Sequence, residues 1–155
     1  MEVISQELIE LDINIETKDQ VIEYVAKKMT EFKRINDKEK LIEDIYLREE
    51  EASTSMGLGV AIPHAQSSAV LEASVVFIRL KNEINWNDDK DVRLVFGIFV
   101  PSENVDNTHL KILAQIARKL ANEDFRNQLL TIQTLEECAK LLESINNQLN
   151  EEQTA

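Results

Sequence analysis

Residues 92–100 read VRLVFGIFV, and residues 74–80 read SVVFIRL. Both runs are short, nearly continuous in apolar residues, and rich in β-branched and aromatic side chains, which is typical of strands that are covered on both faces. A sheet with two covered faces needs helices on each side of it. These two runs therefore predict an α/β domain with a central mixed sheet flanked by helices on both faces.

The chain before these runs predicts one more strand and then two helices. Apolar and polar residues alternate over Ile9–Ile15, which is the pattern of a half-buried strand. Thr17 begins a sequence with the form of a capping box, so a helix is expected from there to about residue 33. Asn36 and Asp37 can cap a second helix, which we expect to end near Arg48.

The remaining segments complete a domain of about five strands. Leu58–Ile62 predicts a short strand that Pro63 stops, and Ile84–Trp86 predicts a short edge strand. Apolar residues at helical spacing follow in the last third of the chain, over 110–120, 125–130 and 135–145, with Cys138 on an apolar face as a buried filler. We expect one domain over residues 1–155, with its core at about 5–146 and a frayed tail at 147–155.

Composition excludes several classes of function. The chain has 155 residues, of which 43% are hydrophobic and 30% charged, and its net charge of −12 disfavours a surface that binds nucleic acid or an anionic membrane. Its apolar runs are far shorter than the roughly 20 residues that span a bilayer, and residues 1–5 lack the positive region of a secretory signal. We expect a cytoplasmic protein with no membrane insertion.

The segment from residue 48 to residue 64 concentrates the residues that could carry chemistry. Over 53–59 the sequence STSMGLG combines small hydroxyl residues with glycines, which would let backbone N–H groups approach an anion closely. Ser53 and Thr54 add hydroxyl donors, and Arg48, at the end of a predicted helix, can offer a guanidinium to the same oxygens. This loop predicts a site that can hold a phosphoryl group.

The chain has two histidines, and each follows a predicted strand. His64 comes directly after Pro63, where we expect its side chain to be exposed at the rim of the sheet. Near neutral pH one imidazole nitrogen is a nucleophile while the other can donate to a fixed acceptor, which suits a phosphohistidine carrier. His109 lies in the first turn of a predicted helix, where open α/β sheets collect their ligands. The alternatives are a loop histidine with local hydrogen bonds and a histidine that only ends a helix.

Metal and nucleotide chemistry have little support in the sequence. A zinc site would need a third ligand beside the two histidines, and no short-spaced cluster of histidine or cysteine supplies one. No Gly-x-x-x-x-Gly-Lys-Ser/Thr loop is present to bind a nucleotide triphosphate. The acidic runs Glu49–Glu51 and Asp88–Asp89 are interpreted as solvated faces. We therefore expect no metal and no cofactor.

These residues together resemble a known family. Arg48-Glu49, Ser53-Thr54 and the run GVAIPHA at 59–65 are similar to the active-site signature of the enzyme IIA domains of the phosphotransferase system, fructose and mannitol family (EIIA type 2). Residues 84–86, Val100-Pro101 and residues 106–113 (DNTHLKIL) resemble a second block of that family. The tryptophan and the Asp-Asn-x-His block look closer to fructose-type members.

The resemblance implies a phosphotransferase with a phosphohistidine intermediate. His64 would accept the phosphoryl group on Nε2 from the phosphohistidine of the carrier protein HPr and pass it to a IIB component, for a fructose-like sugar that enters through the membrane IIC permease. His109 would contact the phosphoryl oxygens or position His64, and Arg48 and Thr54 would help bind the group. An alternative is a regulatory, nitrogen-related IIA module that is controlled by phosphorylation of the same histidine.

Two further expectations follow from the resemblance. Ser55 stands where the family commonly has glycine, so it would either supply an extra donor to the loop or restrict its backbone. No IIB, IIC or HPr-like segment accompanies the domain, so we expect a free-standing IIA whose partners arrive by diffusion. Its acidic charge would then help to recruit HPr through a basic docking face.

Overall fold

The two apolar runs form the two longest strands of the sheet, β5 (Ser74–Trp86) and β6 (Asp89–Pro101), which pair antiparallel as a hairpin. The computed structural model describes residues 2–103 and 107–154. Six strands form one mixed sheet in the order β1-β5-β6-β3-β2, and β4 also pairs with β6. The predicted α/β architecture is confirmed, with six strands where about five were expected.

The other elements follow in chain order. The short strands are β1 (Ile9–Ile13), β2 (Ser55–Gly57), β3 (Val60–Ala61) and β4 (His64–Ser67), with a 3-10 helix at Gln6–Leu8 before β1. The helices are α1 (Lys18–Glu31), α2 (Lys38–Glu51), α3 (Thr108–Leu120), α4 (Glu123–Thr131) and α5 (Leu135–Thr154). Helix α5 thus continues past Gln148, through the residues that were expected to fray, because glutamine, glutamate and leucine there are good helix formers.

Side-chain caps begin the first two helices, as the sequence predicts. The Thr17 hydroxyl oxygen accepts a hydrogen bond from the Gln20 backbone N–H at 3.1 Å, and the Asp37 carboxylate accepts one from the Lys40 N–H at 3.1 Å. Each cap satisfies a backbone donor that the first turn of a helix leaves without a partner. The caps therefore fix where α1 and α2 begin.

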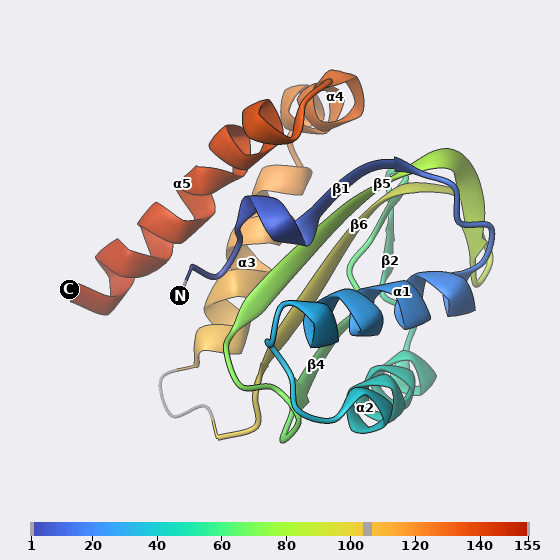
Figure 1. The fold of residues 1–155 in the computed structure, drawn as a ribbon. Coiled ribbons are helices and arrows are strands. Elements are labelled where there is room, and N and C mark those ends of the chain that lie inside the picture. The colour runs from blue at the N-terminus through green and yellow to red at the C-terminus, as the bar shows by residue number, and fades with distance from the viewer. Residues whose placement is uncertain (1, 104–106, 155) are drawn as a thin grey trace.

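Helices cover both faces of the sheet (Figure 1). Buried residues of α1 and α2 pack on one face, and buried residues of α3, α4 and α5 pack on the other. Cys138 is fully buried in the second core, as predicted, and burial raises the pKa of its thiol to about 11. Among the described residues, no helix combines the length and the apolar character that crossing a membrane requires.

Two of the predicted strands differ from the structure. Ile84–Trp86 is not a separate edge strand, because β5 continues through it after an irregularity in register, and Trp86 is fully buried. Of the strand predicted over 58–62, only Val60–Ala61 (β3) is a strand in the structure. Gly57, Leu58 and Gly59 all have positive φ and form the turn between β2 and β3. Pro63 interrupts pairing only briefly, so that β3 and β4 pair in succession along the same edge of β6.

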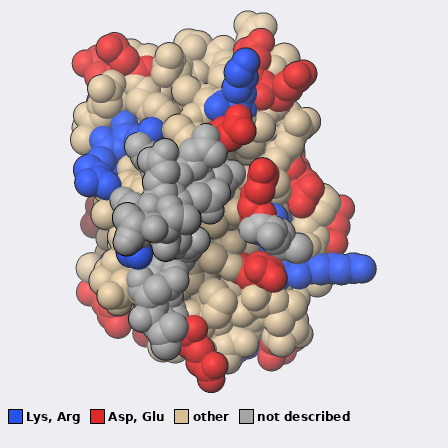
Figure 2. All heavy atoms as spheres, turned by 90° about the vertical axis from the view of Figure 1, so that its left-hand side faces the viewer, with Lys and Arg blue, Asp and Glu red and all other residues tan. Residues whose placement is uncertain are grey.

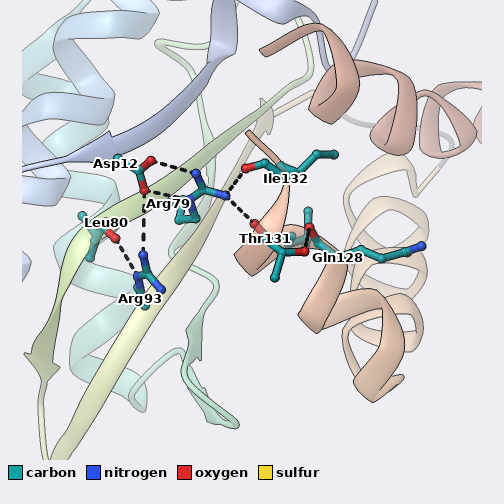
Figure 3. A network of polar contacts seen from close by, with 8 residues as sticks. Asp12, Arg79, Leu80, Arg93, Gln128, Thr131 and Ile132 are labelled. Carbon is teal, nitrogen blue, oxygen red and sulfur yellow. Dashed lines mark hydrogen bonds and ion pairs between the residues drawn. The ribbon is translucent and has the colours of Figure 1, made fainter. Parts of the chain in front are cut away.

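A buried arginine joins the sheet to the C-terminal helices (Figure 3). The Arg79 guanidinium on β5 donates to both carboxylate oxygens of Asp12 at 2.9 and 2.8 Å. It also donates to the backbone oxygens of Leu129 and Ile132, where α4 ends. Arg93 donates to the Leu80 carbonyl and lies 3.8 Å from Asp12. This network fixes the end of α4 against β5.

Candidate active site

His64 begins strand β4, at the point where the chain resumes pairing with β6. Its register partner is Ile98, whose N–H donates to the Pro63 carbonyl at 3.0 Å. Helix α2 packs against β4, which brings the last turn of that helix to the imidazole. The residue is 8% exposed, so the expected exposure at the sheet rim is wrong: the strand that begins at His64 draws the ring inward instead of presenting it on a loop.

Hydrogen bonds at both ring nitrogens fix the tautomer of His64. Its Nδ1 lies 2.7 Å from the Ile62 carbonyl oxygen, and because a carbonyl only accepts, Nδ1 carries the hydrogen. Its Nε2 lies 3.2 Å from Arg48 Nε, which donates to it. The lone pair of the imidazole is therefore on Nε2, the nitrogen that faces Arg48.

The surroundings of His64 favour the neutral ring. Burial lowers the pKa of the imidazole below its ordinary value of 6.5, and the positive charge of Arg48 lowers it further. The bond to the Ile62 carbonyl and the negative charges of Glu49 and Glu51 oppose this shift without reversing it. At neutral pH the ring is uncharged, which is the form that can act as a nucleophile.

Arg48 is brought to His64 as predicted. It lies in the last turn of α2, where a cation is favoured by the helix dipole, and its side chain is 33% exposed. Besides the contact with His64, its Nη1 donates to the Ala52 carbonyl at 3.0 Å, and Glu51 lies 4.0 Å from its Nε. The guanidinium thus contacts the nitrogen that bears the imidazole lone pair and is itself partly exposed to solvent.

The loop after α2 is held by internal hydrogen bonds. Thr54 is 7% exposed, and its hydroxyl and backbone N–H both donate to the carboxylate of Glu49. Ser53 is exposed, and its hydroxyl oxygen accepts from the Ser55 N–H at 3.2 Å. The role of Ser53 and Thr54 as phosphoryl ligands stays a prediction, and in this structure the Thr54 hydroxyl proton is directed at Glu49.

Ser55 contacts a different part of the fold. Its hydroxyl donates to Asp89, at the start of β6, at 3.1 Å. The serine therefore joins β2 to the tip of the β5–β6 hairpin. Gly59, in the adjoining turn, has a φ of +76° and approaches the Asp91 carbonyl so closely that a Cβ would lie 3.2 Å from that oxygen. These two contacts hold the β2–β3 turn against the β5–β6 hairpin.

Glu49 is part of the Arg48-Glu49 motif noted in the sequence, but no role in the site was predicted for it. The interpretation of residues 49–51 as a solvated face is wrong for this residue, which is 7% exposed. Its carboxylate accepts from Thr54 and from the indole N–H of Trp86 at 3.4 Å. A signal was present in the spacing, because Leu41, Ile45 and Glu49 recur every four residues and so share the buried face of α2.

His109 lies in the first turn of α3, as predicted, with Asn107 as the N-cap residue. The side chain of His109 and all of Asp106 lie outside the described part of the structure. The expectation that His109 contacts the phosphoryl oxygens or positions His64 therefore stays a prediction. Among the residues that the structure describes, no group of three or more His, Cys, Asp or Glu is placed to hold a metal ion.

Comparison with known families identifies the chain's relatives. Residues 2–145 match the family model of the phosphoenolpyruvate-dependent sugar phosphotransferase system, EIIA 2. The chain belongs to this family. The resemblance of the sequence motifs is thereby confirmed, and membership makes this chain an EIIA-type phosphotransfer component of such a system.

Individual relatives agree with this membership. The EIIA chain is 36% identical over 126 residues to a fructose-specific EIIA component of Haloferax volcanii, covering 80% of this chain and 81% of that one. The crystal structure of the nitrogen regulatory protein IIA-Ntr from Neisseria meningitidis is 30% identical, with a TM-score of 0.82, covering 90% of this chain and 96% of that one. The mannitol enzyme IIA of Escherichia coli, solved in complex with phosphorylated enzyme IIB, shares the fold at 23% identity and a TM-score of 0.75, with 90% and 96% covered.

Proposed function

We propose that His64 is the phosphoryl-carrying residue of this EIIA chain. It accepts the group on Nε2 from the phosphohistidine of HPr and passes it to a IIB component, from which it goes to a fructose-like sugar that enters through a membrane IIC permease. The observation that carries the proposal is the pair of contacts on the ring, with Nδ1–H held by the Ile62 carbonyl and Nε2 facing Arg48. This is the arrangement of a pre-oriented nucleophile beside a cation.

The transfer exchanges one phosphorus–nitrogen bond for another. The Nε2 lone pair of His64 forms a bond to phosphorus while the donor's phosphorus–nitrogen bond breaks, and the donor imidazole leaves with that electron pair. For this to happen the Arg48 N–H must leave Nε2, and the same guanidinium can then donate to the phosphoryl oxygens. Phosphoryl transfer depends mainly on positioning and on stabilising charge on those oxygens, so Arg48 serves both the resting and the phosphorylated form.

The neighbouring residues complete the proposed site. Ser53 is exposed, and its hydroxyl can donate to a phosphoryl oxygen while its oxygen accepts from Ser55. Thr54 lies beside it, and His109 would contact the group or position His64. The onward step forms a bond between phosphorus and the acceptor side chain of IIB, usually a cysteine in this family, and returns the electron pair to Nε2. The complex of the mannitol enzyme IIA with phosphorylated IIB supports a IIB partner.

The acidic surface suits a basic partner. The net charge is −12, and on the face in Figure 2 acidic side chains are spread around much of the outline, whereas basic side chains gather at a few places. Complementary charge speeds the encounter of two proteins that must bind and part quickly. We propose that this charge recruits HPr.

A regulatory role is the second candidate, and one observation favours it. The nitrogen regulatory IIA-Ntr of Neisseria meningitidis matches this chain at 30% identity and a TM-score of 0.82. In that role His64 would take the phosphoryl group as before, but its phosphorylation state would control another protein. The fructose-specific name of the Haloferax volcanii relative, at 36% identity, favours transport.

A phosphotransfer assay tests the proposal. Mixed with phosphoenolpyruvate, enzyme I and HPr, the chain should become an acid-labile, base-stable phosphoprotein, and His64→Ala should abolish labelling while the fold is retained. Labelled protein should then lose its phosphoryl group to a cognate IIB. Full labelling of folded His64→Ala would move the carrier to another residue. Labelling without transfer to any IIB tested would favour the regulatory role.

A further inference from the structure

The Glu49 carboxylate connects three parts of the fold beside His64. It accepts hydrogen bonds from the Thr54 hydroxyl and, at 3.4 Å, from the Thr54 backbone N–H. It also accepts from the indole N–H of Trp86, a fully buried side chain at the end of β5, at 3.4 Å. One acid therefore joins the last turn of α2, the loop that follows it, and the β5–β6 hairpin.

A carboxylate is costly at this position, so its presence needs a reason. Glu49 is 7% exposed, and burying a charge is unfavourable unless donors compensate it. It also lies in the last turn of α2, where the helix dipole disfavours an anion. Ile45 and Leu41 occupy the same helix face one and two turns earlier, so an apolar residue would continue the packing. The three donors offset the cost of the charge, and the charge fixes the loop.

The position of Glu49 relative to the reacting ring matters more than its contribution to packing. Arg48, the next residue toward the N-terminus, donates to His64 Nε2, so the two side chains approach the site from consecutive positions of one helix turn. We propose that Glu49 is a positioning residue for phosphoryl transfer, which holds the 53–54 loop against His64 and stabilises the positive charge that the imidazole gains as its bond to phosphorus forms. This inference rests on the proposed function.

The chemistry of the step explains why a negative charge is useful here. Nε2 gives its lone pair to phosphorus while Nδ1 keeps its hydrogen, so the ring becomes cationic in the transition state. The Ile62 carbonyl meets the Nδ1–H, but it carries no full charge to balance the ring. Glu49 supplies that charge without touching the phosphoryl group, and its negative charge raises the pKa of His64 against the effects of burial and of Arg48.

The test replaces Glu49 by its neutral isostere and compares it with a matched control. Glu49→Gln keeps the shape of the side chain but places an amide N–H₂ against N–H and O–H donors. Glu50→Gln removes the same charge from the next residue of the same helix, whose side chain is exposed. In phosphoryl transfer from HPr, Glu49→Gln should lower kcat by about tenfold to a hundredfold. Losses of this size are typical when a residue that orients a metal-binding side chain is replaced, and we expect a similar effect here. The KM for HPr should stay unchanged, because a buried side chain cannot contact the partner.

A titration separates this role from a purely structural one. In nuclear magnetic resonance spectra of the unphosphorylated protein, the His64 pKa should fall in Glu49→Gln and stay near the wild-type value in Glu50→Gln. If wild type is labelled normally but the two variants have the same kcat and the same His64 pKa, the inference about Glu49 is overturned while the proposed function stands. If wild type takes no phosphoryl group on His64, the proposed function fails instead, and the titration still decides whether Glu49 acts on the ring.

A second variant covers the case in which Glu49→Gln does not fold. Thr54→Val removes one donor to the carboxylate and leaves the charge in place, and valine matches threonine in shape. Under this inference Thr54→Val loosens the loop and slows transfer, whereas the His64 pKa, which responds to the charge, is unchanged. Transfer at the wild-type rate in Thr54→Val would show that the connection between Glu49 and the loop does not position the site.

Discussion

Replacing Arg79 with methionine tests how the C-terminal helices are held to the sheet. Arg79 is 4% exposed, and its guanidinium donates to Asp12 on one side and to the Ile132 carbonyl on the other (Figure 3). It also donates to the Leu129 carbonyl. Methionine fills similar volume with a flexible apolar chain, so little cavity forms. What is lost is the set of hydrogen bonds.

The cost can be assembled from those bonds. Two carbonyl oxygens at the end of α4 lose a donor, at about 1 kcal/mol or slightly more each. The Asp12 side chain is 52% exposed, so water hydrates its carboxylate after the change, and the lost ion pair adds at most about 1 kcal/mol. The free energy of unfolding should therefore fall by about 3 kcal/mol, and the melting temperature by roughly 6–12 °C for a domain of this size.

Urea unfolding followed by circular dichroism measures this loss, with Arg93→Met as the control. Arg93 is 35% exposed, donates to one carbonyl and lies 3.8 Å from Asp12, so its replacement should cost less than about 1 kcal/mol. Equal losses in the two variants, or a loss below about 1 kcal/mol in Arg79→Met, would refute the idea that the buried guanidinium fixes α4.

The pH dependence of the loss gives an independent check. The hydrogen bond from Arg79 is the largest influence on Asp12 and holds the pKa of that carboxyl below its ordinary value of 3.8. A lowered folded-state pKa means that this contribution is complete above pH 3.8 and is lost as the pH falls through the lower folded value. The stability difference between wild type and Arg79→Met should therefore shrink in strong acid. A constant difference down to the acid transition would contradict this assignment.

Three further predictions concern the site and its turn. Arg48→Gln should raise the His64 pKa toward 6.5 by removing the nearby positive charge, which the imidazole resonances in nuclear magnetic resonance spectra can show. A decrease in that pKa would contradict the electrostatic role of Arg48. Gly59→Ala should lower the free energy of unfolding by about 2 kcal/mol and Gly57→Ala by about 1 kcal/mol, because both residues have positive φ but only Gly59 lies close to a backbone oxygen. Equal losses in urea unfolding would show that the contact of a Cβ at position 59 with that oxygen has no cost. His109→Ala should still be labelled but pass its phosphoryl group to IIB slowly, and onward transfer at the wild-type rate would leave His109 a structural role.

Periodicity and caps were enough to predict most of the fold. The apolar runs at 74–80 and 92–100 became the central hairpin, and Thr17 and Asp37 cap helices as expected. The errors lie where long-range pairing overrides local pattern. Trp86 follows polar residues and precedes a polar turn, so its neighbours in sequence suggest an edge, whereas the continued pairing of β5 with β6 buries it.

Only part of the candidate site could be predicted, because some of it also depends on long-range pairing. Arg48 precedes His64, which is one of only two histidines, by 16 residues in the same motif, so their contact could be anticipated from the sequence. The burial of His64 could not, because it depends on the chain resuming a strand directly after Pro63. Glu49 was interpreted as part of a solvated acidic run, although its helical phase with Ile45 and its place in the Arg48-Glu49 motif distinguish it from its exposed neighbours.

A buried imidazole in contact with a partly exposed cation is consistent with the proposed role of His64, in which a group is taken up and given away. In the resting state Arg48 donates to the Nε2 lone pair, which stabilises the neutral ring and lowers its proton affinity. Under the proposed function, phosphorus on Nε2 would displace this contact and the same cation would donate to the phosphoryl oxygens, so one favourable contact would replace another. Under the proposed function, this exchange would offset part of the cost of losing the resting contact, so that neither form of the carrier would be strongly favoured by Arg48 alone.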